Sequence, residues 1–472
     1  MYNLAIIGAG PAGYTCAIRA AQLGKSVALI ERDVVGGICI NWGCTPSKAM
    51  ITSAKYARHA RLSHEFGVIL DGISVDFRKV SERRDQVIRE SREEVRKLLD
   101  RWGVTLIAGE AQVLDPHTIQ IGNKGIKAEN IVYATGSEPI LPPFADPSDP
   151  SIISSNRLVT IRELPKELTI IGGGIIAFEI ATIFCHLGTK VRIVELSCDC
   201  LTCLDTDIGG VILREMEKIG VQIMTNHKVV SLKTGILTLE NQLTKETLVL
   251  DSPMNLIAIG RKPVIFEEEL KRLGIEHTYR GIGVNEYMQT NIPNIYAVGD
   301  STGISILAHV AIQQAIIAAE HMDWKSSSFA KATADGLNSQ KEDIPEPRKM
   351  KYDVIPAVIY TIPEGATVGL VPHNPPDNIR TVRYPFTANL RSHIEDTTEG
   401  FVKLWIDKNT NKLVGAQVVH EYAGEIIQAY ANMIELKLDL STTANIIHAH
   451  PTFNEIVRNS LEHALDRAVE YY

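Results

Sequence analysis

The stretch NLAIIGAGPAGYTCAIRAAQLGKSVALIE, residues 3–31, decides the fold expected for this chain. It reads as an apolar strand, a glycine turn, an amphipathic helix and a second apolar strand. Gly8, Gly10 and Gly13 follow the G-x-G-x-x-G spacing. The first glycine permits the tight turn, the second lets backbone approach a pyrophosphate, and the third lets the helix pack close to the strand. Glu31 ends the second strand, where a carboxylate can accept hydrogen bonds from a ribose diol. We therefore predict a dinucleotide site here, in preference to a turn whose glycines serve packing alone.

The same pattern returns in ELTIIGGGIIAFEIATIFCHLGTKVRIVE, residues 167–195. Gly172, Gly174 and Ala177 occupy the turn, and Glu195 follows the first glycine by 23 residues, as in the first copy (31 − 8 and 195 − 172). Two separated units predict two cofactors in one enzyme, with an electron carrier held between them. Glu195 would accept from a free ribose 2′-OH and repel a 2′-phosphate, which favours NAD over NADP. The alternative is a solvated acid at a strand end, and alanine in the third position also occurs in NADP-binding relatives.

The composition limits the remaining classes of function. The 472 residues suggest about three domains of roughly 150 residues each. A net charge of −8 with interspersed signs does not favour nucleic acid as a partner. No apolar run approaches the roughly 18 residues that span a bilayer, and the first strand lacks the basic flank of a signal peptide. Seven cysteines are too few for a secreted disulfide scaffold, so we expect a reducing cytoplasm.

A second distinctive stretch, GGICINWGCTPSK (residues 36–48), holds Cys39 and Cys44. A structural zinc site needs about four ligands, and no second cysteine pair at suitable spacing follows. On a regular helix, residues five apart lie roughly 8–9 Å apart at Cα, beyond the ~7 Å limit for a bridge. A disulfide therefore requires a distorted segment, which the glycines at 36, 37 and 43 permit. Because so small a loop adds little stability, a redox-active pair beside a flavin is favoured over a structural staple.

Three further cysteines form the run CDCLTC, namely Cys198, Cys200 and Cys203. They follow Glu195 directly. A metal site is one reading of this run, but we interpret the three as ordinary loop thiols. No metal is expected in this chain.

Residues 36–48 resemble the active-site disulfide segment of the flavin-dependent pyridine nucleotide-disulfide oxidoreductases. AIRAAQLG (17–24) and IIHAHPTFNEIV (446–457) most closely resemble the members of this family that oxidise dihydrolipoamide. Four further motifs of the family occur in order: VYATGSEP (132–139), IAIGRKP (257–263), TNIPNIYAVGD (290–300) and IYTIPEGATVGL (359–370). The resemblance covers nearly all of residues 1–322 and 351–465.

The resemblance implies an α/β chain with two Rossmann-like dinucleotide-binding domains, for FAD and NAD, plus a central domain and a C-terminal α+β dimerisation domain. We place the FAD domain at 1–145, the NAD domain at 146–265, the central domain at 266–346 and the dimer-interface domain at 347–472. The polar stretch at about 323–349 lacks apolar periodicity, and we expect it to be an exposed, mobile insertion.

The resemblance also assigns cofactor contacts residue by residue. FAD would be bound by Gly8, Gly10, Gly13, Glu31, Lys48, Ala111, Asp300 and Ala308. The nicotinamide dinucleotide would contact Gly172, Gly174, Ile175, Ile176, Glu195, Val229 and Gly260. Lys48 would lie near the reactive flavin nitrogen and pair with Glu179.

The remaining chemistry requires a base, and the motif HAHPTFNE implies His450 with Glu455 as the carboxylate that fixes its tautomer. His448 is interpreted as structural. In the implied mechanism His450 deprotonates a substrate dithiol, whose thiolate attacks Cys39. Cys44 is then released as a thiolate that passes its electrons to FAD, and NAD⁺ receives them as a hydride. The family supplies this histidine from the partner subunit, so a homodimer is expected.

The activity implied is oxidation of protein-bound dihydrolipoamide to lipoamide with NAD⁺ as acceptor. The expected partners are lipoyl domains and the acyltransferase core of a 2-oxo-acid dehydrogenase complex, or a glycine cleavage lipoyl protein. One alternative is a related flavin disulfide reductase that acts on another small or protein disulfide with NAD(P)H. A second alternative is a weakly active structural subunit of an acyltransferase complex.

Overall fold

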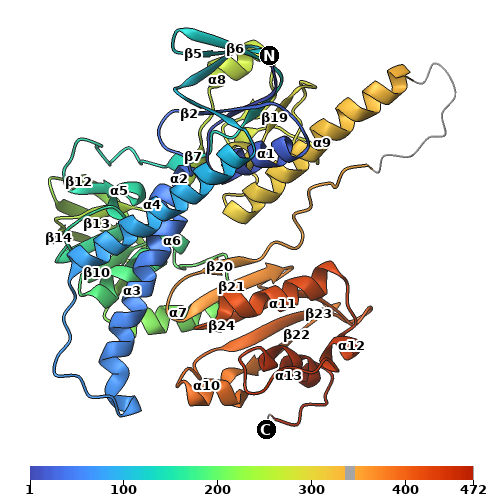
Figure 1. The fold of residues 1–472 in the computed structure, drawn as a ribbon. Helices are drawn as coiled ribbons and strands as arrows, with labels where there is room; N and C mark the ends of the chain where they lie inside the picture. The colour runs from blue at the N-terminus through green and yellow to red at the C-terminus, as the bar shows by residue number, and fades with distance from the viewer. Residues whose placement is uncertain (335–345, 471–472) are drawn as a thin grey trace. The chain divides into compact units, whose positions relative to one another are not determined.

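The computed structural model describes residues 1–334 and 346–470, with side chains described for 1–326 and 346–470 (Figure 1). The chain forms two compact units. The first comprises residues 1–49, 81–140 and 261–351, and the second comprises residues 50–80, 141–260 and 352–472.

The first unit is built on a seven-stranded sheet in the order β3-β2-β1-β6-β5-β4, with β19 also pairing with β6. Its strands are β1 (Tyr2–Ile7), β2 (Val27–Glu31), β3 (Thr105–Ala108), β4 (Ala111–Asp115), β5 (Thr118–Ile121), β6 (Lys124–Tyr133) and β19 (Ile295–Ala297). Strands β3, β2, β1, β6 and β19 are parallel, whereas β4 and β5 form antiparallel pairs. The carboxyl ends of β1, β6 and β2 therefore meet at one edge, where the first glycine turn lies.

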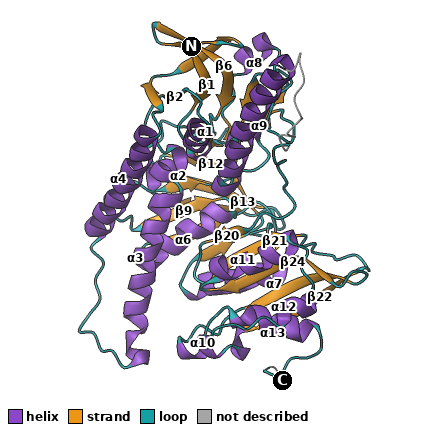
Figure 2. Cartoon of the chain, turned by 45° about the vertical axis from the view of Figure 1, so that its right-hand side comes forward, coloured by secondary structure: helices purple, strands orange, loops and turns teal. Residues whose placement is uncertain are grey.

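Helix α1 (Pro11–Gln22) follows that turn because Pro11 suits the first helical position, and because Ala12, Cys16 and Ala20 form its buried stripe. Both views show α1 beside the first half of α9 (Ala308–Ala334), and Arg19 Nη2 lies 2.8 Å from Glu320 Oε1 (Figures 1 and 2). The unit also contains α2 (Gly37–Trp42), α8 (Glu267–Leu273), the 3₁₀ turn η2 (Gly299–Thr302) and the strand pairs β7 (Ser137–Pro139) with β16 (Arg261–Pro263) and β17 (His277–Thr278) with β18 (Gly281–Ile282). Helices α3 (Cys44–Leu62) and α4 (Phe77–Arg101) each contribute to both units.

The second unit repeats the strand–turn–helix arrangement on a five-stranded parallel sheet in the order β11-β10-β9-β15-β8. Its elements are β8 (Ile152–Ser154), α5 (Ser155–Leu158), β9 (Glu167–Ile171), α6 (Ile175–Leu187), β10 (Lys190–Val194), α7 (Thr206–Lys218), β11 (Gln222–Met224) and β15 (Asn255–Ile257). An antiparallel sheet of β12 (His227–Lys233), β13 (Ile236–Asn241) and β14 (Thr247–Asp251) adjoins it. The 3₁₀ turn η1 (Ser63–Phe66) follows α3.

The C-terminal part of the second unit is an antiparallel sheet in the order β20-β21-β24-β23-β22, whose strands are orange in Figure 2. Its strands are β20 (Ala357–Ile359), β21 (Glu364–Gly369), β22 (Ile379–Pro385), β23 (Phe401–Asp407) and β24 (Lys412–His420). The helices are η3 (Phe386–Ala388), α10 (Leu390–Ile394), α11 (Ala423–Glu435), α12 (Leu440–Ala444) and α13 (Glu455–Ala464). Alternating residues of the strands and one face of α11 and α13 form a single apolar core.

The predicted α/β class is confirmed, with two strand–turn–helix units and a C-terminal α+β region. Helix α9 continues to Ala334, so residues 323–334 of the predicted insertion at 323–349 are helical, while the exposure and mobility of the insertion remain predictions. Polar contacts hold that continuation, since Lys25 Nζ lies 2.9 Å from both Asp323 Oδ1 and Ser326 Oγ. Residues 335–345 of the predicted insertion lie outside the described residues. The four domain limits remain predictions.

Candidate active site

Two glycines of the first turn, Gly8 and Gly13, lie so close to neighbouring backbone atoms that a side chain would not fit. Gly8 has φ = 102° and donates its N–H to Ile30 O at 2.8 Å. A Cβ at Gly8 would lie 2.3 Å from Ala134 O, and one at Gly13 would lie 1.8 Å from Gly8 O. Helix α1 therefore starts in direct backbone contact with the turn, which is the packing role predicted for Gly13.

The second turn repeats the close backbone packing at its first glycine. Gly172 has φ = 113°, and a Cβ there would lie 2.4 Å from Ala258 O. At Gly174, in contrast, a Cβ would meet nothing within 4 Å. Packing does not require glycine at that position. Glycine there fits a ligand phosphate that must approach the backbone at the N-terminus of α6, so the residues present suit a dinucleotide.

The two acids are held in the same way. Glu31 Oε2 accepts from Ala9 N at 2.7 Å, and its Oε1 accepts from Asp33 N at 2.9 Å. Glu195 Oε2 accepts from Gly173 N at 2.5 Å, and its Oε1 accepts from Ser197 N at 2.7 Å. A carboxylate offers about four acceptor positions, so each acid retains about two for the hydroxyls of a ribose. Both sites therefore fit a nucleotide with a free ribose diol.

Cys39 and Cys44 form a disulfide across a break between two helices. Cys39 lies in α2, Cys44 begins α3, and Gly43 between them has φ = −133° and ψ = −105°. The Cα atoms are 4.6 Å apart, at the short end of the range for a bridge. The predicted departure from a regular helix is confirmed and lies at Gly43, whereas Gly36 and Gly37, with φ values of 103° and 55°, precede Cys39 at the start of α2.

Asn41, inside the cysteine segment, is a residue that sequence reasoning missed. Its side chain is 1% exposed and donates from Nδ2 to Gly37 O at 2.8 Å and to Val35 O at 3.1 Å. Arg92 Nε of α4 donates to Asn41 Oδ1. These bonds fasten the short helix that carries Cys39. An amide between two cysteines of an otherwise apolar segment was the available signal.

Asp300 lies at the end of the first sheet in a small polar cluster. Ser137 Oγ donates to Asp300 Oδ2 at 2.5 Å, and Arg261 Nε donates to Ser137 Oγ at 2.8 Å. Burial raises the pKa of Asp300, although the Ser137 hydroxyl and the Arg261 charge oppose the rise. Both partners lie in motifs quoted from the sequence, but their link to Asp300 was not predicted.

His450 and Glu455 are brought together at the start of α13. His450 Nδ1 lies 2.9 Å from Glu455 Oε1, and Thr452 N donates to Glu455 Oε2 at 2.8 Å. Burial would raise the pKa of Glu455, but the bonds from Thr452 and His450 lower it below its ordinary value. The carboxylate is therefore ionised at neutral pH and fixes Nδ1 as the protonated nitrogen, leaving Nε2 as the acceptor.

The other residues predicted to contact a cofactor lie on several helices, strands and turns of the two units. Ile175 and Ile176 begin α6, Gly260 joins β15 to β16 with φ = 128°, Ala111 begins β4, Ala308 begins α9, and Val229 is a buried residue of β12. Lys48 lies on α3 in the first unit. Glu179 lies buried on α6 in the second unit, where its Oε1 accepts from Tyr360 N at 3.0 Å.

The CDCLTC loop contacts the second turn. Cys200 is buried, and its Sγ would lie 2.7 Å from a Cβ at Gly173, while Cys198 and Cys203 are exposed. Burial raises the pKa of Cys200 to about 12, with the charge of Glu195 acting in the same direction.

Across residues 1–326 and 346–470, no group of three or more His, Cys, Asp or Glu side chains is arranged to hold a metal ion. No helix in the described part of the chain has the length and apolar character to cross a membrane.

The chain is similar to known proteins over nearly its whole length. Residues 2–315 match the model of the pyridine nucleotide-disulphide oxidoreductases, and residues 355–461 match the dimerisation domain of the same family. The dihydrolipoyl dehydrogenase of Geobacillus stearothermophilus is 34% identical, with 98% of this chain and 95% of that protein covered. The dihydrolipoyl dehydrogenase of Haloferax volcanii is 32% identical, with 99% and 97% covered. The solved structure of the HOCl-induced flavoprotein disulfide reductase RclA from Escherichia coli is 26% identical, with a TM-score of 0.80 and 98% and 99% covered.

These matches confirm the predicted FAD-dependent oxidoreductase with FAD and NAD as cofactors. The dimerisation domain supports the predicted homodimer. With both family models matched over most of its length, the chain belongs to the pyridine nucleotide-disulphide oxidoreductase family.

Proposed function

We propose that the protein oxidises a dihydrolipoyl dithiol to the cyclic disulfide and transfers two electrons to NAD⁺. The observation that carries the proposal is the Cys39–Cys44 disulfide, which is an acceptor suited to a dithiol. Relatives named dihydrolipoyl dehydrogenase, at 32–34% identity over nearly the whole chain, favour this substrate over other dithiols.

His450 is the proposed base. Its Nδ1 is held by Glu455, and its side chain is 64% exposed in the single chain, so Nε2 is accessible to a substrate thiol. Only a thiolate attacks a disulfide at a useful rate, which is why the dithiol needs a base of this kind. In the homodimer we assign His450 to the site of the partner subunit.

The exchange balances in two steps. The first substrate thiol loses its proton to His450, and its sulfur attacks Cys39 while the Cys39–Cys44 bond breaks. The second substrate thiol then displaces Cys39, which closes the lipoyl disulfide and leaves Cys39 and Cys44 reduced. Two electrons and two protons have left the substrate. NAD⁺ accepts both electrons with one proton as a hydride, the second proton is released to solvent, and the Cys39–Cys44 bond forms again.

We assign the cofactor-binding residues as the family resemblance of the sequence implies. Bound FAD supplies two-electron transfer between the Cys44 thiolate and NAD⁺. We assign its binding to Gly8, Gly10, Gly13, Glu31, Lys48, Ala111, Asp300 and Ala308. We assign NAD binding to Gly172, Gly174, Ile175, Ile176, Glu195, Val229 and Gly260, and we propose that Glu179 pairs with Lys48. The proposed partners are lipoyl domains with their acyltransferase core, or a glycine cleavage lipoyl protein.

The direct test is NADH formation from dihydrolipoamide by the FAD-loaded dimer. His450→Gln should lower this rate by ~10²-fold or more, the usual scale for loss of a general base, while FAD content stays constant. His448→Gln is the matched control, because His448 bonds only its own loop through Ile446 O at 2.9 Å among the contacts found in the described chain. A dimer with full FAD that does not oxidise dihydrolipoamide would reject the proposed activity. Equal rates for His450→Gln and wild type would exclude His450 as the base.

One observation favours a second candidate, reduction of another disulfide with NAD(P)H. The likeness to RclA, named a flavoprotein disulfide reductase, spans 98% of this chain. NADPH-dependent reduction of glutathione disulfide or a protein disulfide, faster than dihydrolipoamide oxidation, would establish that candidate instead.

A further inference from the structure

We propose that Phe453 and Tyr422, backed by His420 and Phe386, form an aromatic clasp that positions the loop bearing His450. These four residues are positioning residues for the thiol chemistry. The inference rests on the proposed role of His450, and the clasp is defined here as the side chains of Phe386, His420, Tyr422 and Phe453.

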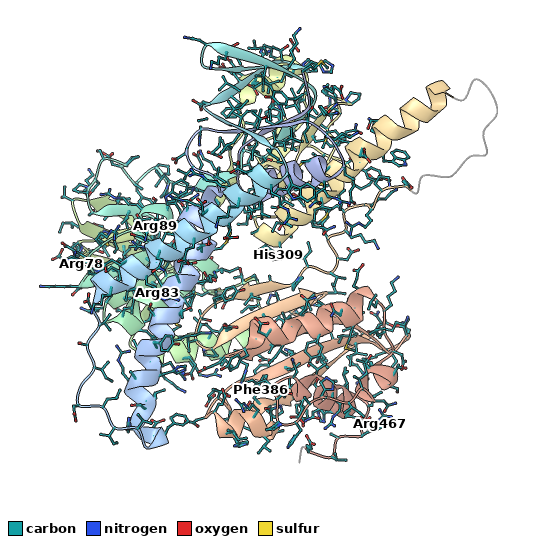
Figure 3. All side chains as sticks on the ribbon, in the orientation of Figure 1. Arg78, Arg83, Arg89, His309, Phe386 and Arg467 are labelled. Carbon is teal, nitrogen blue, oxygen red and sulfur yellow. A yellow bond between two sulfur atoms is a disulfide. The ribbon has the colours of Figure 1, made fainter. Side chains whose placement is uncertain are left out.

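The rings of the clasp form two stacked pairs, Tyr422 with Phe453 and Phe386 with His420, which are joined by a tilted contact between Phe453 and His420 with planes 56° apart. Phe453 lies three residues after His450, and its ring centroid is 4.5 Å from Tyr422, with planes 24° apart, and 4.9 Å from His420. His420 stacks on Phe386 with 3.8 Å between centroids and 15° between planes. Phe386, labelled in Figure 3 beside α10, is fully buried in the core of the C-terminal sheet. The loop is thus joined to the core through two successive ring contacts, Phe453 with His420 and His420 with Phe386, and Tyr422 packs on Phe453.

His420 acts in the clasp as a neutral ring. Its Nε2 lies 2.9 Å from Thr397 O, and its Nδ1 accepts from Tyr422 N at 3.3 Å. Burial lowers its pKa to about 4. The ring is therefore uncharged at neutral pH and is fixed by both nitrogens, which makes it a rigid support for Phe453 and Tyr422.

A hydrogen bond from Asn389 also holds the loop that bears His450. Asn389 is buried and donates from Nδ2 to Thr452 O at 3.1 Å, while its Oδ1 accepts from Ser392 N at 3.1 Å. Thr452 N in turn donates to Glu455 Oε2 at 2.8 Å. Phe453 and Thr452 are therefore held independently, one by rings and one by an amide.

This anchoring bears on the His450–Glu455 distance. Glu455 is the first residue of α13 and is buried, so the helix fixes it. His450 precedes the helix by five residues and is exposed, so its position depends on the loop. Displacing a reacting group by ~1 Å can cost ~10²-fold in rate, so loss of the clasp should be visible in catalysis without loss of the fold.

The outer members of the clasp lie at the rim of the core, where truncation is tolerated. Tyr422 is 38% exposed, and its hydroxyl donates to Glu395 Oε2 at 3.3 Å. Arg391 pairs with Glu395, and its guanidinium carbon lies 6.0 Å from the Phe453 ring centroid. Removing the Phe453 or Tyr422 ring therefore leaves the buried pair of His420 and Phe386 in place.

The test measures two reactions on the FAD-loaded dimer of Phe453→Ala. One is dihydrolipoamide oxidation by NAD⁺, which uses His450, and the other is NADH oxidation by an artificial dye, which does not need that base. We expect kcat for the first to fall about tenfold or more and kcat for the second to stay within twofold, because only the first depends on a precisely held base. Phe453→Tyr should restore the first rate to within about threefold, since it keeps the ring stack. Tyr279→Ala, which removes a ring that is 80% exposed in the first unit, is the control.

The outcomes separate the clasp from the proposed function. Phe453→Ala with dihydrolipoamide turnover within twofold of wild type, or with equal losses in both reactions, would overturn the clasp. If Phe453→Ala does not fold, Tyr422→Ala is judged by the same two rates. His450→Gln run beside them isolates the other failure: unchanged turnover in that variant rejects the base itself, whereas a loss in His450→Gln without one in Phe453→Ala rejects only the clasp.

Discussion

The two glycine turns hold their acids identically but pack their helices differently. Glu31 and Glu195 each accept two backbone N–H groups, one from the turn and one from the loop that follows. In the first turn the third position must be glycine, since a Cβ at Gly13 would lie 1.8 Å from Gly8 O. In the second turn Ala177 carries a Cβ and is fully buried. The acid and the first two glycines therefore define the ligand chemistry, whereas the third position sets how closely helix and strand pack.

The largest effect should come from Gly13→Ala. The added methyl overlaps a backbone oxygen that no rotamer change can move, so we expect a loss of stability on the order of 3 kcal/mol and little bound FAD. Flavin absorbance per chain and thermal unfolding measure both effects. Ala177→Gly is the matched variant, and it should cost only about 1 kcal/mol. If Gly13→Ala kept full FAD and a wild-type melting temperature, the distinction between the turns would be lost.

A smaller effect is expected from Gly174→Ala, which separates ligand approach from packing. The site has open space for a Cβ and φ = −88°, so the fold should be unchanged. The methyl would stand where a pyrophosphate must approach, and we expect the KM for NAD⁺ to rise about tenfold with FAD content constant. Steady-state kinetics with varied NAD⁺ give the answer. An unchanged KM would mean that the second turn does not receive the phosphates.

The smallest effects should come from substitutions in the loop that follows Glu195. This loop contains cysteines, whereas the loop that follows Glu31 does not. Cys198 and Cys203 are exposed, so Cys198→Ser and Cys203→Ser should leave the KM for NAD⁺ within about twofold, as surface substitutions usually do. Kinetics before and after treatment with a chelator provide the check. A loss of NAD⁺ affinity in either variant would show that the loop contributes to NAD⁺ binding. A chelator effect on wild type alone would show that the loop binds a metal.

The local parts of the site were predictable because short stretches of chain determine them. The glycine turns, their acids and the broken helix between Cys39 and Cys44 follow from spacing and backbone sterics. The bonds that fasten them were not predictable. Arg92 reaches Asn41 across 51 residues, and Asn389 reaches Thr452 across 63, and no local pattern pairs such residues.

The helical state of residues 323–334 was not predictable for a similar reason. These residues lack an apolar stripe, yet they continue helix α9. Lys25 contacts the first turn of this stretch through Asp323 and Ser326, which are polar partners. Hydrophobic periodicity does not detect a helix that is fastened in this way.

We assign FAD to the first glycine turn and NAD to the second. The most direct measurement is FAD bound per chain together with the Kd for NAD⁺, determined on Glu31→Gln and Glu195→Gln side by side. Replacing a carboxylate that bonds a ribose removes a charge-assisted hydrogen bond, which is worth about tenfold or more in affinity. We predict that Glu31→Gln loses FAD, and that Glu195→Gln keeps FAD and binds NAD⁺ at least tenfold more weakly. Loss of FAD from Glu195→Gln with NAD⁺ affinity unchanged would contradict the assignment.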